Sequence, residues 1–288
     1  RVDQKISDLD SFFVRYAYDD ATSVNAQELY LFRSGAKTRQ QYLTLVESHF
    51  FTLHTINAFR FSYTRPVDYT DVIYSIDIPR SLYFIPTAPN FGQITIPGVA
   101  TMGPSNTLPD GSKQNSFQFA DDIVAQRGSH SLKFGVDIHR YRWDIFNSNS
   151  KGAVWGFNSL ENFLQAGPEG TELIVALPGS DNKKALRQTL AGFYVQDGWR
   201  FSSRLRLDLG LRYEVASIIK EKDGRSSFLP DWVHDTALQN GPMLGHNPSL
   251  RNFSPRVGFS WSPRSTDTLL INGGFGIYFD PLLEYVID

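Results

Sequence analysis

The sequence of 288 residues contains no cysteine, no long apolar run and almost no excess of either charge. Without cysteine the chain holds no disulfide scaffold, no cysteine-based zinc site and no thiol nucleophile. Its 28 basic and 30 acidic side chains nearly cancel, so no global positive field draws it to nucleic acid. The longest apolar runs, such as Leu173 to Leu177, fall far below the roughly 20 residues of a membrane-spanning helix. These absences exclude a helical membrane protein and argue against a nucleic-acid partner.

Aromatic residues are plentiful, with 22 phenylalanines and 13 tyrosines in a composition that is 14% aromatic. They suit a β-rich soluble core, but they equally suit a membrane β-barrel. A transmembrane β-strand needs only about 9–11 residues, of which every second one is apolar, so a barrel looks average in bulk composition. The pattern along the chain must therefore distinguish the two classes.

The clearest pattern runs from Arg204 to Val215, where leucine, tyrosine or valine alternates with mostly charged residues. Strict alternation places the two sets on opposite faces of a β-strand. The run is about twice the usual strand length, and three arginines and two acids on one face are unusual in a soluble sheet. The same period recurs from Thr268 to Phe279. Both segments therefore predict strands with one apolar and one more polar face.

Weaker patterns extend this prediction to ten strands that pair in sequence as hairpins. The predicted strands are Val2–Ile6, Ser11–Asp19, Gln41–Phe50, Ile56–Thr64, Asn115–Gln126, Ser131–Ile145, Leu190–Phe201, Arg204–Ser217, Phe253–Ser262 and Thr268–Phe279. Short turns alternate with long segments at Asp20–Gln40, Arg65–Gln114, Phe146–Thr189 and Ile218–Asn252. Short turns at one end and long loops at the other are typical of outer-membrane barrels. The sequence therefore predicts an all-β, antiparallel, up-and-down transmembrane β-barrel with long extracellular loops and short periplasmic turns.

Two defects interrupt the alternation. In Ser131–Ile145 the apolar set changes phase, which predicts either a β-bulge near His139–Arg140 or a strand that runs past the bilayer. Asp121 and Asp197 fall on the nominally apolar faces of their strands. Because a charge at mid-bilayer costs several kcal/mol, each must lie near an interface, face protein or mark a register break.

Several segments also resemble a family. Phe193 to Arg200, followed by Leu205 to Glu214, resembles the barrel hairpin of TonB-dependent outer-membrane receptors, and the likeness is closest to the Oar-like branch of soil bacteria. Further segments that fit are Arg1–Asp3 with Phe12–Tyr16, Phe117–Asp122 leading to His130–Gly135, and Asn252–Phe259. The resemblance covers all ten strands but not the long loops. It implies a 22-strand barrel around a plug domain, with the TonB energy-coupling complex as partner.

The chain departs from that family in what it lacks. It begins at Arg1 without a signal peptide, shows no plug domain and no energy-coupling box, and stops at Asp288 without an aromatic-terminated final strand. Ten strands are fewer than half of 22. Residues 1–288 are therefore expected to be a single partial barrel domain, an internal fragment of a longer receptor. A naturally closed ten-strand barrel is the alternative.

The two faces of the strands define candidate site residues. The lumen-facing candidates are Arg60, Lys133, Asp137, Arg204, Arg206, Asp208, Arg212, Glu214 and Arg256. They would line a wet channel or contact a plug, or else form a ladder of cross-strand charge pairs that holds the register. The lipid-facing candidates are Leu205, Leu207, Leu209, Leu211, Leu269, Ile271, Phe275 and Ile277.

Aromatic residues near the strand ends are candidates for the two interfacial girdles. Trp199, Phe201 and Trp261 lie near short turns and would suit the periplasmic girdle, whereas Tyr63, Trp143 and Tyr278 would suit the outer one. Packing in a soluble core is the alternative. In the predicted loops, Tyr69, Trp155, Phe157 and Trp232 are candidates for stacking on a ligand, with packing inside the loops as the alternative.

Nothing in the sequence predicts catalysis, a cofactor or a metal site. The six histidines are scattered without clustered carboxylates or thiols. The glycine-rich stretch from Gly273 to Gly276 lies inside a strand and opens no helix, so it is no phosphate loop. No Gly-x-Ser-x-Gly elbow occurs. The chain is therefore not expected to be an enzyme.

Two functions remain, from different classes. The first is a receptor barrel in the bacterial outer membrane, in contact with lipid, whose outer loops capture an unidentified small molecule, glycan or peptide for energy-coupled uptake. The second is a soluble or surface-exposed β-sheet protein that binds carbohydrate or peptide through loop aromatics. The environment of Leu205, Leu207, Leu209 and Leu211 distinguishes them. A second layer of the same chain over these leucines would contradict the barrel, and an exposed apolar belt would contradict the soluble protein.

Overall fold

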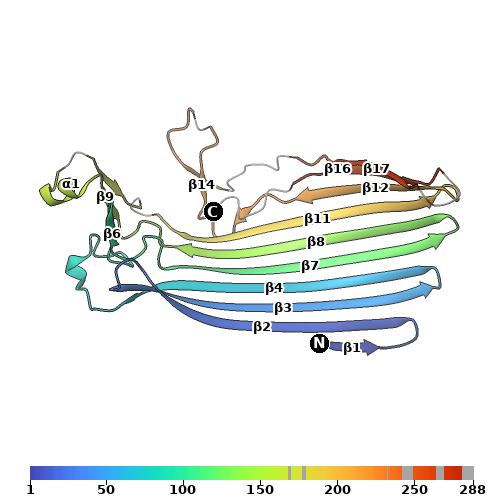
Figure 1. The fold of residues 1–288 in the computed structure, drawn as a ribbon, viewed down its shortest axis with the longest axis horizontal. Coiled ribbons are helices and arrows are strands. Elements are labelled where there is room, and N and C mark those ends of the chain that lie inside the picture. The colour runs from blue at the N-terminus through green and yellow to red at the C-terminus, as the bar shows by residue number, and fades with distance from the viewer. Residues whose placement is uncertain (168–169, 177–179, 232, 242–248, 264–268, 281–288) are drawn as a thin grey trace.

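The computed structural model describes residues 1–167, 170–176, 180–231, 233–241, 249–263 and 269–280. Ten strands follow one another across a large antiparallel sheet, each beside its neighbour in sequence (Figure 1). They are β1 (Val2–Lys5), β2 (Asp10–Ala26), β3 (Phe32–Thr52), β4 (Thr55–Tyr74), β7 (Asp110–Arg127), β8 (His130–Asn147), β11 (Lys183–Arg200), β12 (Leu205–Ala216), β16 (Asn252–Trp261) and β17 (Ile271–Gly276). The predicted all-β, up-and-down order of ten strands is confirmed.

The six strands β2, β3, β4, β7, β8 and β11 are longer than the sequence predicts, whereas β1, β12 and β17 are shorter. β3 and β4 have 21 and 20 residues, and β2 reaches Ala26 before β3 begins at Phe32. The predicted long loop at Asp20–Gln40 is therefore wrong, since most of it is strand. Beyond the apolar part of a strand neither face has to be apolar, so the chain remains extended without an alternating signal.

The register of β8 is unbroken against both of its neighbours, from His130 to Phe146. The bulge predicted near His139 is therefore wrong, and the alternative of a strand that runs past the bilayer fits. β8 has 18 residues, well beyond the roughly 9–11 that a tilted strand needs to cross the hydrocarbon. Side chains continue to alternate between the two faces along the whole of β8. The change of phase in the apolar residues therefore marks the point where the strand leaves the apolar zone.

The hairpin turns gather at one end of the large sheet, and the smaller elements gather at the other, called here the loop end (Figure 1). A four-stranded sheet combines β10 (Thr171–Ile174), β9 (Val154–Phe157), β5 (Gln93–Ile96) and β6 (Val99–Met102). The remaining small elements are η1 (Arg80–Leu82), α1 (Leu160–Gln165), β13 (Lys220–Glu221), which pairs with β11, and the ribbon of β14 (Ser227–Phe228) and β15 (Gln239–Asn240). None of the described helices is long and apolar enough to cross a membrane.

Most of the buried apolar side chains lie at the loop end. They include Phe32, Ala88, Ile96, Leu108, Val154 and Ile219. Helix α1 is fixed there by Ser159, whose hydroxyl accepts the Asn162 N–H and so satisfies an N-terminal donor. The connections at this end are thus packed structures with a small core of their own.

The large sheet has two edges, β1 and β17. These edges do not pair with each other in the described part of the chain, so the ten strands form an open sheet. An open edge leaves a row of backbone N–H and C=O groups unpaired, which hydrocarbon cannot satisfy. The fold therefore needs further strands, or closure, to span a membrane.

Candidate functional site

One side of the large sheet is apolar and uncovered. Leu211 pairs with Val195, Val195 with Phe134, and Phe134 with Ile123, so that all four share this apolar face. The side chains of Leu209 and Leu211 are 41% and 43% exposed. Leu205, Leu207, Ile271 and Phe275 lie on the same face by register, while Leu269 and Ile277 lie just outside β17. In Figure 1 the large sheet is a single layer, which agrees with the exposure of Leu209 and Leu211 in the described structure.

The opposite, polar face carries most of the charged candidates. Register places there Arg60, Lys133, Asp137, Arg206, Asp208, Arg212, Glu214 and Arg256. Arg204 does not belong with them, because β12 begins at Leu205 and Arg204 is exposed in the preceding turn. The turn is closed by Ser202, whose hydroxyl accepts the Arg204 and Leu205 N–H groups.

Asp122 is the centre of the polar face. Its carboxylate is nearly buried and accepts hydrogen bonds from Arg60 Nη2 at 2.6 Å and from the Tyr194 hydroxyl. Lys133 Nζ lies 3.4 Å from the same carboxylate. The four side chains come from β4, β7, β8 and β11, so one carboxylate ties four strands together. Sequence analysis missed Asp122 as a site residue, although its position next to Asp121 places it on the polar side by alternation.

Two glycines make room for this network. A Cβ added to Gly135 would lie 2.4 Å from both the Tyr194 ring and an Asp122 oxygen. A Cβ added to Gly192 would lie 2.4 Å from Arg212 Nη2. Tyr194 therefore crosses the bare backbone of β8 to reach Asp122, and its ring lies between Lys133 and Arg212 at 5.4 and 5.6 Å.

Further polar pairs extend the network along β8 and β12. Asp137 accepts from Gln118 Nε2 at 3.0 Å and lies 3.0 Å from His139 Nε2. Arg212 Nε donates to Glu214 at 2.8 Å. Two hollows open over these groups, one of about 260 Å³ beside Arg60, Lys133 and Arg256, and one of about 280 Å³ beside His139 and Glu214. The polar face thus holds cross-strand charge pairs and also keeps space for water or a polar partner.

The comparisons with known proteins agree with this two-faced sheet. The family described as "Outer membrane beta barrel domain" matches residues 1–286. The chain belongs to the outer membrane beta-barrel domain family. It is therefore a protein of the bacterial outer membrane, and the apolar face, which no other part of the described chain covers, is in contact with lipid. This location contradicts the soluble alternative.

Three solved structures are similar to this chain over most of its length, and one of them, with a TM-score above 0.5, shows the fold. The outer membrane transporter YddB from Escherichia coli matches with a TM-score of 0.54 at 12% identity, over 97% of this chain and 31% of that transporter. A Pseudomonas aeruginosa FadL homologue matches at 13% identity, over 93% of this chain and 56% of that one, with a TM-score of 0.34. The alcaligin outer membrane receptor FauA from Bordetella pertussis matches at 10% identity, over 91% and 42%, with a TM-score of 0.23. No curated protein matches. The chain thus spans about a third of YddB.

The register places the predicted girdle residues on both faces of the sheet. At the turn end of this outer-membrane barrel domain, Trp199 and Trp261 lie on the lipid-facing side, and Phe201 contacts Trp199 from the turn, with ring centroids 4.9 Å apart. At the other end, Tyr63 is on the lipid-facing side beside Phe117, with ring centroids 5.0 Å apart.

Two predicted members of the outer girdle are on the polar face instead. Trp143 pairs with Gln114 and Leu186 in an unbroken register, so it points opposite to Tyr63. Its assignment to the lipid-facing girdle is wrong, because no bulge in β8 turns its side chain to that side. Tyr278 follows β17, and its ring lies 4.4 Å from the guanidinium carbon of Arg256, which is a polar-face residue. Its girdle assignment is wrong as well, because the alternation of β17 continues past its last residue.

The two aspartates on the lipid-facing side are hydrogen-bonded to neighbours there. Asn57 Nδ2 donates to Asp121 Oδ1 at 2.5 Å, and His130 Nδ1 lies 2.7 Å from Asp197 Oδ2. Both strands keep their register at these positions, so neither residue marks a break. Asp197 lies three residues before the end of β11, close to the turn-end interface. Pairing with a polar neighbour lowers the cost of a charge at this surface.

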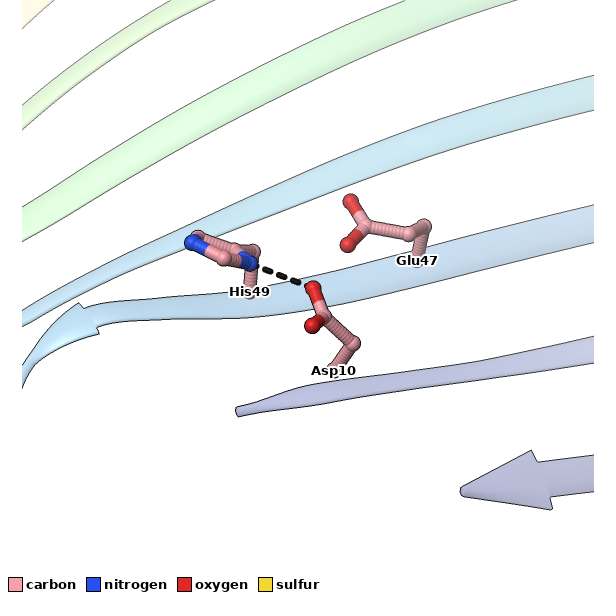
Figure 2. A group of neighbouring side chains, drawn as sticks. All are labelled: Asp10, Glu47 and His49. Atoms are coloured by element: carbon pink, nitrogen blue, oxygen red, sulfur yellow. Dashed lines mark hydrogen bonds and ion pairs between the residues drawn. The ribbon is translucent and has the colours of Figure 1, made fainter. Parts of the chain in front are cut away.

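A third polar group on the same side combines Asp10, Glu47 and His49 (Figure 2). His49 Nδ1 pairs with Asp10 Oδ1, and Figure 2 shows the Glu47 carboxylate beside this pair. The candidate ligand atoms all lie within 4.8 Å of one another, which suits a divalent cation. Sequence analysis missed this group because only the β2–β3 register brings Asp10 opposite His49.

The predicted loop aromatics differ in their surroundings. Tyr69 is not in a loop, since β4 extends to Tyr74, and this assignment is corrected. Trp155 of β9 is 37% exposed, which leaves its ring accessible at the loop end. Phe157 packs against Phe163 of α1, with ring centroids 5.2 Å apart, so packing within the loop accounts for it. Trp232 lies outside the described residues.

The connection from β2 to β3 is tied to the loop-end sheet. Hydrogen bonds from the side chain and backbone N–H of Thr101 in β6 hold the pKa of Glu28 below its ordinary value. Gln27 also accepts the Ser105 N–H, at 2.8 Å. These contacts join segments more than 70 residues apart in sequence and order the end of the barrel that carries the loops.

Proposed function

We propose that this chain is a barrel segment of a TonB-dependent outer-membrane receptor that captures a ligand in its outer loops for energy-coupled uptake. The observation that carries the proposal is the polar face around Asp122, where charged side chains from β4, β7, β8 and β12 and a tyrosine from β11 lie opposite a lipid-facing surface. A face of this kind lines the lumen of a large barrel and offers hydrogen-bonding groups to a plug domain or to a passing ligand.

The size of the complete barrel is the second part of the proposal. β1 and β17 are the outer strands of an open sheet, and the chain spans 31% of the E. coli transporter YddB. We therefore propose that further strands of the same protein pair with both edges to complete a barrel of about 22 strands. The lumen of such a barrel is wide enough to hold a plug domain, against which Arg60, Lys133 and Arg256 would lie.

The packed connections at the loop end supply the capture surface in this proposal. Trp155 is the exposed aromatic side chain of a loop-end element among the described ligand-contact candidates, since Tyr69 is exposed on the long strand β4, and β9 holds Trp155 in a small sheet. A rigid aromatic platform loses little conformational entropy when a sugar or peptide stacks on it. No step in this function requires covalent chemistry, so the proposed role is transport and not catalysis.

The test compares nutrient depletion by three strains of the native bacterium: the parent, a strain without the gene for this protein, and a strain without a functional TonB. We expect at least one compound to disappear from the medium of the parent and to remain in the media of both mutants. Trp155→Ala in the native protein should slow uptake of that compound, and Trp261→Phe serves as an aromatic control at the turn end. Uptake that persists without TonB would contradict energy coupling.

A further inference from the structure

The lipid-facing side of the sheet carries a band of basic residues beyond its apolar rows. On β2, β3, β4, β7, β8 and β11, register assigns nine cations to this side towards the loop end, namely Arg33, Lys37, Arg39, Arg65, Lys113, Arg140, Arg142, Lys183 and Arg187. The acids on the same side and at the same end of these strands are Asp20, Asp71 and Asp144. This basic band is therefore strongly positive, in a chain whose net charge is -2.

The height of the band follows from the distance to the hairpin turns. Arg65 lies eleven residues after His54, and Arg140 lies eleven residues after Ser129, both of which are turn residues. At about 3.3 Å per residue and a tilt of about 40°, eleven residues rise roughly 28 Å, just past an apolar band of about 25 Å. The other cations of the band lie farther still from their turns. The band therefore lies at the lipid headgroups of the leaflet away from the turns.

The centre of the band is short of counter-charge. Arg142 and Arg187 are directly opposite each other in the β8–β11 register, and like charges in that position destabilise a sheet. Asp144 pairs with both Arg187 at 2.7 Å and Lys113 at 3.2 Å. Asp144 is thus the one carboxylate at the level of the five cations Arg65, Lys113, Arg140, Arg142 and Arg187 on this side of the described strands. Asp71 of β4 and Lys183 of β11 are on the same side but lie farther towards the loop end.

The surroundings of these five residues suit an amphipathic lipid. The buried Nε of Arg65 has no hydrogen-bond partner in the described structure. Arg142 lies over the Phe117 ring, 5.6 Å from its centroid, and Phe117 contacts Tyr63 at the level where the apolar rows end. A hollow of about 480 Å³ adjoins Lys113, Lys183 and Arg187 of the basic band, together with Asp144. The aromatic rings on the side nearer the turns would contact the acyl chains of such a lipid. The guanidinium groups nearer the loop end would contact its phosphate groups.

The opposite end of the same side has the opposite charge. Towards the turns, it carries Asp10, Glu47, Asp121 and Asp197 against a single arginine, Arg127, on the described strands β2 to β11. Positive charge is therefore not a general property of the lipid-facing surface. It is confined to one leaflet.

We propose that Arg65, Lys113, Arg140, Arg142 and Arg187 bind the phosphate groups of a phosphorylated glycolipid of the outer leaflet, a lipid of the lipid A class. Guanidinium groups match phosphate oxygens through pairs of parallel hydrogen bonds. Arg140 and Arg142 of β8 and Arg187 of the adjacent β11 can together engage more than one phosphate. The bound phosphate offsets the repulsion between Arg142 and Arg187. This site is separate from the proposed uptake function, since it depends only on the outer-membrane location and on the outward side of the sheet.

The test measures lipid retained by the native protein, purified in detergent and mixed with defined lipids, by native mass spectrometry. The probes are diphosphorylated lipid A, the same lipid with both phosphates removed, and phosphatidylglycerol. We expect the parent to retain diphosphorylated lipid A and to release the other two. The triple variant Arg140→Gln, Arg142→Gln, Arg187→Gln should retain at least about tenfold less. Arg127→Gln is the matched control, because it removes an arginine from the same side at the turn end, and it should retain as much as the parent.

A second variant changes retention in the opposite direction. Asp144→Asn removes the single carboxylate at the centre, so retention of diphosphorylated lipid A should increase. Heat-modifiable mobility on a gel verifies that every variant is folded before binding is compared. Equal retention of lipid A with and without phosphates would overturn the proposal. Equal retention of phosphatidylglycerol, or displacement of lipid A by inorganic phosphate at similar concentration, would also overturn it, because the site would then accept any anion.

Discussion

The two faces of strand β12 show how differently adjacent residues are stabilised. Arg212 lies on the polar face, where its guanidinium pairs with Glu214 and lies beside the Tyr194 ring. Leu211, one position earlier, is 43% exposed, because it lies on a face that no other part of the described chain covers. Charged groups at the centre of the polar face, such as Arg212 and Asp122, pair within the chain, whereas the apolar face depends on lipid. The contrast teaches that hydrogen bonds and ion pairs within the chain stabilise the polar face, whereas the surrounding lipid stabilises the apolar face.

Leu211→Arg should have the largest effect, because it places a charge in the apolar band. We expect the native protein to lose about 2–4 kcal/mol of unfolding free energy in phospholipid vesicles, the cost of arginine near the middle of the bilayer. Equilibrium unfolding in urea measures it. Leu211→Met keeps the side chain apolar and should stay close to the parent. Equal stability of Leu211→Arg and the parent would show that this face is not in lipid.

Asp122→Asn tests the polar face at its centre. The change leaves Arg60 and Lys133 facing each other without a carboxylate. Removal of one partner from a buried pair costs about 3–5 kcal/mol, but the Arg60 side chain is 43% exposed, so we expect a smaller loss of about 1–3 kcal/mol. The same urea titration measures it.

The control is Asp208→Asn on the same face. Arg206 and Asp208 form a pair whose side chains are 60% and 51% exposed, so its loss should cost no more than about 0.5 kcal/mol. If both changes had equal effects, the Asp122 network would be no more than a surface ion pair.

Gly135→Ala tests whether the contact between Tyr194 and Asp122 requires a residue without a side chain at position 135. The new Cβ would meet the Tyr194 ring and Asp122, and we expect a loss of about 1–2 kcal/mol through crowding. Adding Tyr194→Ala should remove the crowding, so the two changes together should cost less than the sum of each alone. Gly258→Ala is the control, because its nearest neighbour would lie 3.7 Å away. Strict additivity of the first two changes would show that Gly135 and Tyr194 are not coupled.

The smallest expected effect is on local opening at the loop end, where the contacts of Glu28 belong to neither face of the large sheet. The pKa of Glu28 is lowered in the folded protein, so its hydrogen bonds to Thr101 stabilise the connection above the unfolded pKa and are lost as the pH falls through the folded one. Glu28→Gln should therefore speed amide hydrogen exchange at Thr101 at neutral pH. The difference from the parent should disappear at a pH below the folded pKa of Glu28, after correction for the intrinsic exchange rate. Unchanged exchange in the variant at neutral pH would contradict this tie.

Alternation was a reliable guide wherever a strand lies inside the apolar band. The opposite faces of Leu211 and Arg212, and the existence of all ten strands, could be predicted because lipid demands an apolar residue at every second position. Beyond the band this demand ends. The extension of β2 to Ala26 and the polar-face position of Trp143 were therefore mispredicted, since the residues there no longer report on which side they lie.

The clusters needed the register between strands. Asp122 and Tyr194 are 72 residues apart, and Asp10 and His49 are 39 apart, so no local pattern connects them. A shift of one residue in any pairing would move every side chain of that strand to the other face. The five central cations of the basic band are likewise spread from residue 65 to residue 187 and meet only across four strands.

The sequence by itself determined that this protein is an antiparallel β-sheet with one apolar and one polar face, because period-two alternation is a local pattern that does not depend on which strands pair. Only the tertiary structure decided which charges meet, that Tyr194 crosses Gly135 to reach Asp122, and that positive charge collects at one end of the lipid-facing side. These features depend on strand pairing, which is fixed by packing and hydrogen bonds between residues far apart in the chain.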